Sequence, residues 1–374
     1  MKYLLLIFSL LYAVPCSAQD VFEKKEFVVE ITGIIDQTTT DEILASPWKV
    51  VSDSKGHIFL WDRKFTSIRV FNRQGEFIKQ IGKSGRGPGE FREINAMTIN
   101  DKDQLVVYDR YLLRFTVFDN LGNEIETYSL PEKNLITPWR LQHSPAAGYF
   151  MVYKRFDQLE RDEVNKPALH RITNNFSEIS NSLVTLAQIG DPEEPFEQLL
   201  FGAYPTLNFT LLRNNEIIVA PYVYRGNLLV YEQKNGEWRR KEELVGTPLP
   251  SEPYKTFSLN KSRNEIPPGA RLINGANDRR AGIIFHESVA LFEMKDSKVI
   301  HFVFFRDDEN GSYLAAEIYN KDLKLIQFGR LKNFEGSRDA SYSITWLDND
   351  ENFYVIDRSD QQNPRILLCR LKEL

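Results

Sequence analysis

Short segments of apolar, β-branched and aromatic residues recur along the whole chain, and turn-forming clusters such as "SDSKG" and "NRQG" separate them. Alternating or continuous apolar runs of this length are typical of β-strands joined in hairpins, and no convincing helical period accompanies them. Residues 57–78 align without a gap on residues 104–125, so that Asp62 falls on Asp109. The chain therefore contains an internal repeat built from strands.

The same repeat recurs in weaker form along the rest of the chain. Six units begin near Trp48, Asn95, Pro138, Thr206, Ser288 and Ser341. Four strands per unit, with a period of about 40–50 residues, indicate a β-propeller, in which neighbouring blades bury each other's faces. The last unit has only three strands, and "FVVEITGI" at residues 27–34 can supply the fourth. We expect an all-β, six-bladed β-propeller formed by residues 19–374 as one domain, its ring closed by this N-terminal strand.

A glycine-rich run, "GKSGRGPGEF", lies between the first two units and is followed by "INAMTINDKDQLVVYD". This combination resembles the NHL-like six-bladed propellers that Bacteroidetes export, within the wider TolB-like and NHL group. The resemblance is strong over residues 48–128 and rests on weaker repeats thereafter. It implies the propeller fold, and it carries no catalytic residues over to this chain.

The glycine-rich run lacks the spacing of a phosphate-binding loop. A P-loop needs a glycine five residues before Gly-Lys-Ser, where Phe77 stands here, and the dinucleotide fingerprint fails because no helical period follows. We predict instead a linker between blades, whose glycines provide tight turns with positive φ.

The first residues predict export. One positive charge, an apolar run from Tyr3 to Val14 and the small residues Ser17 and Ala18 indicate a signal peptide over residues 1–18. A lipid anchor at Cys16 is the competing hypothesis, which the preceding proline fits poorly. We expect a periplasmic, cell-surface or extracellular protein, with no transmembrane segment because no other apolar run approaches ~20 residues.

Composition narrows the class of partner. The net charge of −5 gives no general attraction to nucleic acid.

After cleavage behind Ala18 the chain keeps a single cysteine, Cys369, so no intramolecular disulfide is possible. Cys369 lies in the apolar strand "RILLCRL", which favours a buried hydrophobic role over a nucleophilic one. We expect a monomer.

Strand order assigns the loops to two faces. The turns after the first and third strands of each unit are short, and they define one end of the ring, the turn face. The loops after the second strands and the linkers between blades define the opposite end, the linker face. The long segments 156–168, 189–205 and 246–282 fall on the linker face, which is therefore the candidate binding face.

Arginines recur on the linker face, because each second strand ends in one, and Arg279 and Arg280 fall on the same face. The candidate ligand-binding residues are Arg63, Arg110, Arg155, Arg225, Arg306 and Arg358, together with Lys83 and Arg86 of the glycine-rich linker. Guanidinium groups suit carboxylate, sulfate or phosphate, so an acidic glycan, a peptide carboxylate or an envelope protein is the expected partner. The alternative is structural, because a repeated Asp-Arg pair can tie a loop to the next strand.

Motifs for metal binding or catalysis are weak. "DNDEN", residues 348–352, resembles the start of a calcium loop, but Phe353 replaces the required glycine and Ser359 the bidentate glutamate, which favours a hairpin turn. The five histidines are scattered. We therefore expect a non-catalytic binding or scaffold propeller with no cofactor. The alternative is a metal-dependent lyase or lactonase with its site in the central channel, for which the first strands offer too few acids.

Overall fold

The computed structural model describes residues 23–130, 137–154, 167–179, 183–190, 207–258, 271–274, 279–307, 311–336 and 342–372. The expected signal peptide and its alternative, the lipid anchor at Cys16, lie outside these residues. The described part of the chain holds no helix with the length and apolar character that a membrane crossing needs.

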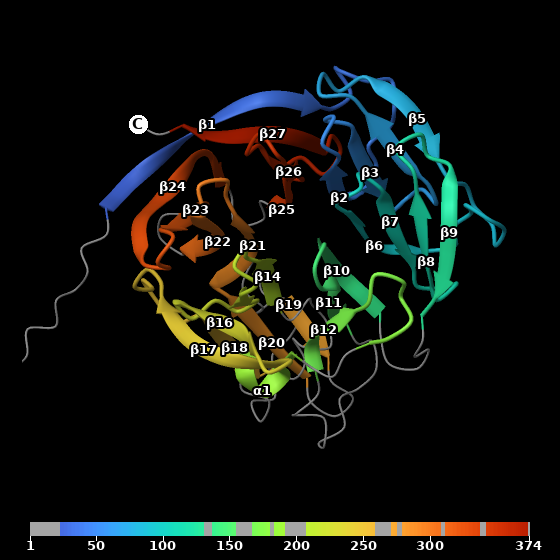
Figure 1. The fold of residues 1–374 in the computed structure, drawn as a ribbon. Helices are drawn as coiled ribbons and strands as arrows, with labels where there is room; N and C mark the ends of the chain where they lie inside the picture. The colour runs from blue at the N-terminus through green and yellow to red at the C-terminus, as the bar shows by residue number, and fades with distance from the viewer. Residues whose placement is uncertain are drawn as a thin grey trace, which may run out of the picture.

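Six antiparallel blades surround a central axis, which confirms the six-bladed propeller (Figure 1). Blade 1 contains β2 (Pro47–Ser52), β3 (Ile58–Asp62), β4 (Ile68–Phe71) and β5 (Phe77–Ile81), and blade 2 contains β6 (Ile94–Ile99), β7 (Leu105–Asp109), β8 (Arg114–Phe118) and β9 (Glu124–Ser129). Blade 3 contains β10 (Thr137–Ser144), β11 (Gly148–Lys154), β12 (Pro167–Ile172) and β13 (Val184–Thr185), and blade 4 contains β14 (Leu207–Leu211), β15 (Ile217–Pro221), β16 (Asn227–Lys234) and β17 (Glu237–Val245). Blade 5 contains β21 (His286–Glu293), β22 (Val299–Asp307), β23 (Gly311–Tyr319) and β24 (Leu325–Gly336), and blade 6 contains β25 (Tyr342–Leu347), β26 (Phe353–Asp357) and β27 (Arg365–Lys372).

The hydrophobic core is divided among the blade interfaces. Each cluster of buried side chains in the described chain joins two neighbouring blades, as Val107 of blade 2 and Phe59 of blade 1 illustrate. Second strands such as β3 are buried along their whole length, because both sheet faces are covered. Aromatic residues at equivalent positions of the repeat are packing residues: Phe71, Phe118, Tyr231 and Tyr319 are all at most 1% exposed.

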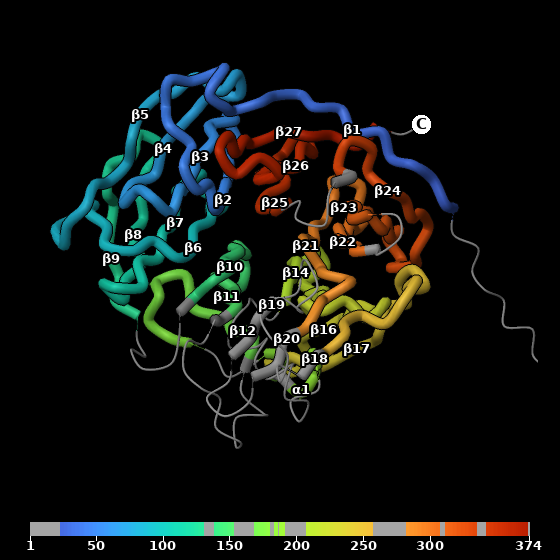
Figure 2. Tube along the Cα trace, turned by 180° about the vertical axis from the view of Figure 1, so that it is seen from behind, coloured from blue at the N-terminus to red at the C-terminus, as the bar shows by residue number. Residues whose placement is uncertain are grey.

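The N-terminal strand β1 (Glu23–Ile35) closes the ring, as predicted from "FVVEITGI". Residues 28–35 pair antiparallel with β27 and complete blade 6. The strand also begins earlier than expected, and residues 23–27 pair in parallel with β24 of blade 5. Figures 1 and 2 show this blue strand running along the outer edges of both blades. One strand therefore covers two sheet edges.

Two features interrupt the propeller pattern. The segment 246–282, expected as a long excursion, contains β18 (Tyr254–Ser258) and β19 (Arg271–Asn274), which flank β20 (Arg279–Ile284) in a separate three-stranded sheet. A four-residue helix, α1 (Leu186–Ile189), follows β13. Most of the other two long excursions, 156–168 and 189–205, lies outside the described residues.

Most inner strands contain a β-bulge that adds one residue. The extra residues in β2, β6, β10, β21 and β25 are Trp48, Asn95, Trp139, Val289 and Thr345. A bulge changes the direction of a side chain, and here two of these side chains reach the neighbouring blade. Thr345 donates a hydrogen bond to the carbonyl oxygen of Val50 at 3.0 Å, and Asn95 donates one to that of Pro138.

The glycine-rich linker folds back on itself. Phe91 is fully buried, and its N–H donates to the carbonyl oxygen of Lys83 at 2.8 Å. The predicted positive φ is confirmed for Gly82 and Gly89, at 75° and 65°, and it is wrong for Gly85 and Gly87. At those two glycines the Glu90 carboxylate occupies the space next to the backbone, and it accepts the Gly87 N–H at 2.8 Å.

Candidate functional site

An aromatic and cationic cluster occupies the linker-face end of the inner strands. The bulges bring the rings of Trp48 and Trp139 into edge contact, with 5.6 Å between their centroids. The guanidinium carbon of Arg63 lies 3.6 Å from the Trp48 ring centre, and that of Arg358 lies 5.3 Å from it. We call Trp48, Trp139, Arg63, Arg110 and Arg358 the Trp48 cluster. Its residues come from blades 1, 2, 3 and 6.

The arginines of this cluster influence one another's protonation. Partial burial beside Trp48 lowers the pKa of Arg63, and the positive charge of Arg110 lowers it further. Burial, together with the charge of Arg63, lowers the pKa of Arg358 to about 10. Arg358 donates hydrogen bonds to the Pro47 carbonyl oxygen and to Ser343 Oγ. These neutral acceptors hold the guanidinium in place without cancelling its charge.

The aspartates of the Asp-Arg pairs act structurally. Asp62 accepts hydrogen bonds from the backbone N–H groups of Ala45, Ser46 and Lys64. Asp109 likewise accepts four backbone N–H groups, from residues 92, 93, 111 and 112. Each carboxylate therefore ties the incoming linker to the loop after the second strand. The structural alternative thus describes these two aspartates, and it also describes Arg110, whose Nε pairs with Glu93 of the incoming linker.

Arg110 of the cluster and two further predicted arginines have acidic or carbonyl partners. Arg110 Nε pairs with Glu93 at 2.8 Å, and Arg306 Nη2 pairs with Glu287 at 3.1 Å. Arg225 donates to the carbonyl oxygen of Ile189 at 3.4 Å. The predicted set is therefore divided, with Arg63, Arg110 and Arg358 gathered at the Trp48 cluster.

Lys83 and Arg86 of the glycine-rich linker contact residues near the linker. Lys83 Nζ lies 3.4 Å from Glu90, and the Arg86 guanidinium carbon lies 5.7 Å from the Tyr111 ring centre. Arg155 and the side chains of Arg279 and Arg280 lie outside what the structure describes. The prediction for these three residues stays a prediction.

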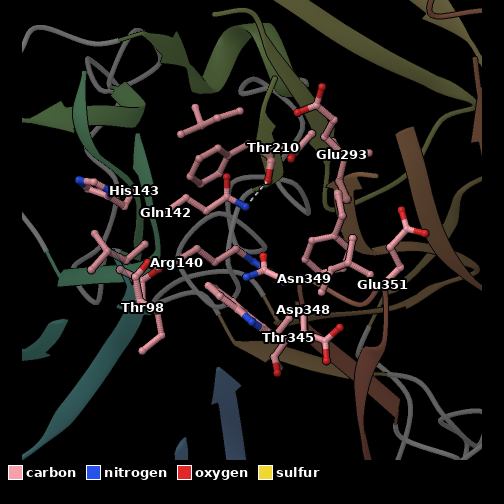
Figure 3. Close-up of a pocket in the computed structure, with 18 of the residues that line it drawn as sticks. Thr98, Arg140, Gln142, His143, Thr210, Glu293, Thr345, Asp348, Asn349 and Glu351 are labelled. Carbon is pink, nitrogen blue, oxygen red and sulfur yellow. Dashed lines mark hydrogen bonds between the residues drawn. The ribbon is translucent and has the colours of Figure 1, made fainter. Parts of the chain in front are cut away.

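A cavity of about 290 Å³ lies in the channel, between the inner strands and the turn face. Figure 3 shows its lining, to which Arg140 and Gln142 of blade 3, Thr210 of blade 4 and Thr345 and Asn349 of blade 6 contribute. This volume is near the lower limit of small-molecule pockets. Two cationic side chains of the inner strands, Lys49 and Arg140, also line this cavity. Neither residue was identified from the sequence.

Lys49 and Arg140 are these cations, and each follows a bulge, at Trp48 and Trp139. The ring encloses Lys49 although its side chain still borders the open cavity. This enclosure, together with the nearby charge of Arg140, lowers the pKa of Lys49 to about 7. Burial lowers the pKa of Arg140 to about 10. Aligning the repeats at the bulge would have placed both cations at one equivalent position.

A second cavity of about 430 Å³ lies between blades 2 and 3 on the turn face. His143 lines both cavities. Its Nε2 lies 3.0 Å from Asn174 Oδ1, and burial lowers its pKa. The imidazole is therefore part of the lining of both cavities.

A serine, a histidine and a glutamate are aligned inside blade 5. Ser288 Oγ lies 2.9 Å from His301 Nε2, and His301 Nδ1 lies 2.9 Å from Glu317 Oε2. The order matches a hydrolytic triad, but a nucleophile must reach its substrate. Ser288 is only 2% exposed, and its hydroxyl also accepts a hydrogen bond from Asn208 of blade 4. This arrangement is a polar contact between blades.

Neither "DNDEN" nor the described histidines form a metal site. Asp348 accepts hydrogen bonds from the backbone N–H groups of Asp350 and Asn352, so "DNDEN" is the predicted hairpin turn. Within the described ranges, no group of three or more histidine, cysteine, aspartate and glutamate side chains is placed to hold a metal ion. Cys369 is fully buried, as predicted, and burial raises the pKa of its thiol to about 12.

One family model matches part of the chain. Residues 19–190 match the family model DUF5128, a 6-bladed β-propeller. The match begins where the predicted signal peptide ends. No curated protein matches the chain.

Solved structures share the architecture over almost the whole chain. A DUF4221 family member from Bacteroides vulgatus is 11% identical with a TM-score of 0.57, over 93% of this chain and 99% of that chain. A Bacteroides fragilis protein inferred to be exported is 13% identical with a TM-score of 0.54, over 94% and 99%. A gluconolactonase candidate is 10% identical with a TM-score of 0.50, over 93% and 94%. At these identities the likeness shows the fold alone.

Proposed function

We propose that the protein is an exported, non-catalytic binding propeller that recognises an acidic glycan at the Trp48 cluster. The observation that carries the proposal is the position of Arg63. Its side chain is exposed, stacks over Trp48, and lies within electrostatic reach of Arg110 and Arg358. Three blades therefore contribute guanidinium groups to one place on a protein whose net charge is −5.

The chemistry of the cluster suits a carboxylate or sulfate group on a sugar. Guanidinium groups bind such anions through two parallel hydrogen bonds, and indole rings offer a flat apolar surface to a sugar ring. The nearby carboxylates are already engaged, because Asp62 accepts backbone N–H groups and Asp357 pairs with Arg365 at 2.9 Å. A ligand anion would therefore find the positive charge of Arg63 and Arg358 available.

The test compares Arg63→Gln with the unchanged protein on acidic oligosaccharides and their neutral counterparts. We expect Arg63→Gln to weaken binding of the acidic set about tenfold, and added salt to weaken binding in the unchanged protein. Arg239→Gln is the matched control, since Arg239 lies on the outer strand β17, is exposed, and pairs with Glu237. It removes the same charge far from the cluster.

Two results would contradict the proposal. If the unchanged protein, Arg63→Gln and Arg239→Gln all bind acidic and neutral oligosaccharides equally, charge does not contribute to recognition. Stoichiometric calcium or zinc in the purified protein, lost on chelation together with an activity on a lactone, would favour the enzyme alternative.

A further inference from the structure

We infer that the channel cavity between Lys49 and Arg140 is a second binding site, which takes a small organic acid from the turn face. The site differs from the Trp48 cluster in position, entrance and ligand size. It does not depend on the proposed glycan binding.

The first argument is that, among the described residues, the two cations have no counter-ion. The Lys49 side chain makes no hydrogen bond or ion pair with any residue that the structure describes. Arg140 donates through Nη2 to the carbonyl oxygen of Val289 at 3.3 Å, whereas its Nε is buried without an acceptor. Burying a charge without a partner is costly, so native proteins pair buried charges or use them. A carboxylate in the cavity would supply acceptors to both groups.

The second argument is that the acids of the cavity rim are engaged elsewhere. Glu293 accepts the backbone N–H of Arg213 and lies 3.8 Å from its Nε. Glu351 accepts the backbone N–H of Lys295 at 2.8 Å. Asp348 is held by its own hairpin turn. None of these acids contacts Lys49 or Arg140, so the interior of the cavity stays positive beneath a mixed rim.

The third argument concerns the size and character of the ligand. A cavity of about 290 Å³ suits a molecule of small size, far below an oligosaccharide. Phe209, Leu291 and Trp346 line it together with Thr98 and Thr210. One or two carboxylates on a short carbon chain would match the two cations and this partly apolar wall. The rim residues Arg213, Lys295 and Asn349 are exposed, which places the entrance on the turn face.

The experiment measures binding by calorimetry and by thermal shift, with succinate and citrate as probes. Succinamide is the neutral control and inorganic phosphate the control for an unspecific anion. We expect succinate or citrate to bind and raise Tm in the unchanged protein, and Lys49→Met and Arg140→Met to weaken that binding at least tenfold. Arg63→Gln should leave it unchanged, which separates this site from the Trp48 cluster.

Folding of the variants is a separate readout. Because methionine fills similar volume without a buried charge, both Met variants should melt at the same temperature as the unchanged protein or higher. Probe binding that is equal in the Met variants would overturn the inference, as would equal effects of succinamide and succinate. Phosphate binding as tightly as every organic acid would overturn the assignment of the ligand class.

Discussion

Tyr224 of blade 4 donates its hydroxyl hydrogen to Glu317 of blade 5, and the oxygen lies 2.8 Å from both carboxylate oxygens. Both side chains are fully buried. Thr247 N–H, Tyr319 Oη and His301 Nδ1 complete the surroundings of the same carboxylate. One acid thus satisfies polar groups from two blades, and the blade 4–5 interface depends on it.

Loss of the Tyr224 hydroxyl should destabilise the propeller. We expect Tyr224→Phe to lower the free energy of unfolding by about 1–3 kcal/mol, because a buried hydrogen bond to a charged group is lost. Burial and Glu317 raise the pKa of Tyr224, so its hydroxyl stays protonated at neutral pH and can donate this bond. Tyr128→Phe, which removes a half-exposed hydrogen bond to Glu126, is the control. Urea unfolding that shows equal losses in both variants would contradict this role.

Closure by β1 gives a second prediction. Val29 is 4% exposed and packs between blades 5 and 6, whereas Val245 at the end of β17 is 79% exposed. We expect Val29→Ala to cost about 1.5–2.5 kcal/mol and Val245→Ala close to nothing. Deleting residues 19–34 should have a far larger effect, because the edges of β24 and β27 lose their partner. A deletion protein with an unchanged Tm would show that the ring closes without β1.

The glycine-rich linker provides a matched pair of substitutions. Gly82 has a φ of 75°, and an added Cβ would meet the Phe91 ring, so Gly82→Ala should cost more than about 1–2 kcal/mol. Gly87 lacks a positive φ, and its added Cβ would meet only the flexible end of Glu90. Gly87→Ala should therefore cost much less. Thermal unfolding of the two variants would rank them, and the reverse order would contradict the packing described for this linker.

Lys49 should make stability depend on pH in an unusual direction. Its folded-state pKa of about 7 lies below the ordinary value of 10.5, so the unfolded chain binds more protons between these values. The free energy of unfolding should therefore rise with pH across this window, relative to Lys49→Met, by less than about 1.4 kcal/mol per pH unit.

Unfolding curves at about pH 6.5 and about pH 9 would measure this difference. A bound carboxylate would raise the pKa of Lys49 again, so saturating succinate should flatten the difference. A difference that does not change with pH, or that falls as pH rises, would show that Lys49 is charged throughout.

The ring could be predicted because its signals are local and repeated. Alternation of apolar residues specifies each strand, and the missing strand of blade 6 could be filled only by the one unassigned segment. The repeat also placed Arg63, Arg110 and Arg358 on one face, but it placed Arg225 and Arg306 there as well, so it did not single out the three that lie together. The sequence could not show which aspartates accept hydrogen bonds from the backbone. Such bonds, like the one from the Ala45 N–H to Asp62, depend on the path of the linker.

The channel cations could not be predicted from the repeat alone. Lys49 and Arg140 occupy the position after the bulge, where Ala96, Ala290 and Trp346 stand in other blades. A bulge has no reliable sequence signal, and without it the two side chains would not be expected to approach each other. The parallel pairing of residues 23–27 with β24 was missed because their charged sequence shows no strand alternation.

The dual pairing of β1 has a consequence for the order in which the molecule can fold. This strand precedes blades 1 to 4 in the chain, whereas its partners β24 and β27 follow them. Contacts of such long sequence separation form slowly, because a long loop must close before they stabilise anything. Blades 1 to 4 can assemble from segments that are neighbours in the chain. The ring stays open until β1 pairs with β24 and β27. Closure is thus possible only after β24 and β27 are in place, so a chain lacking them would keep its apolar edges open to proteases and chaperones.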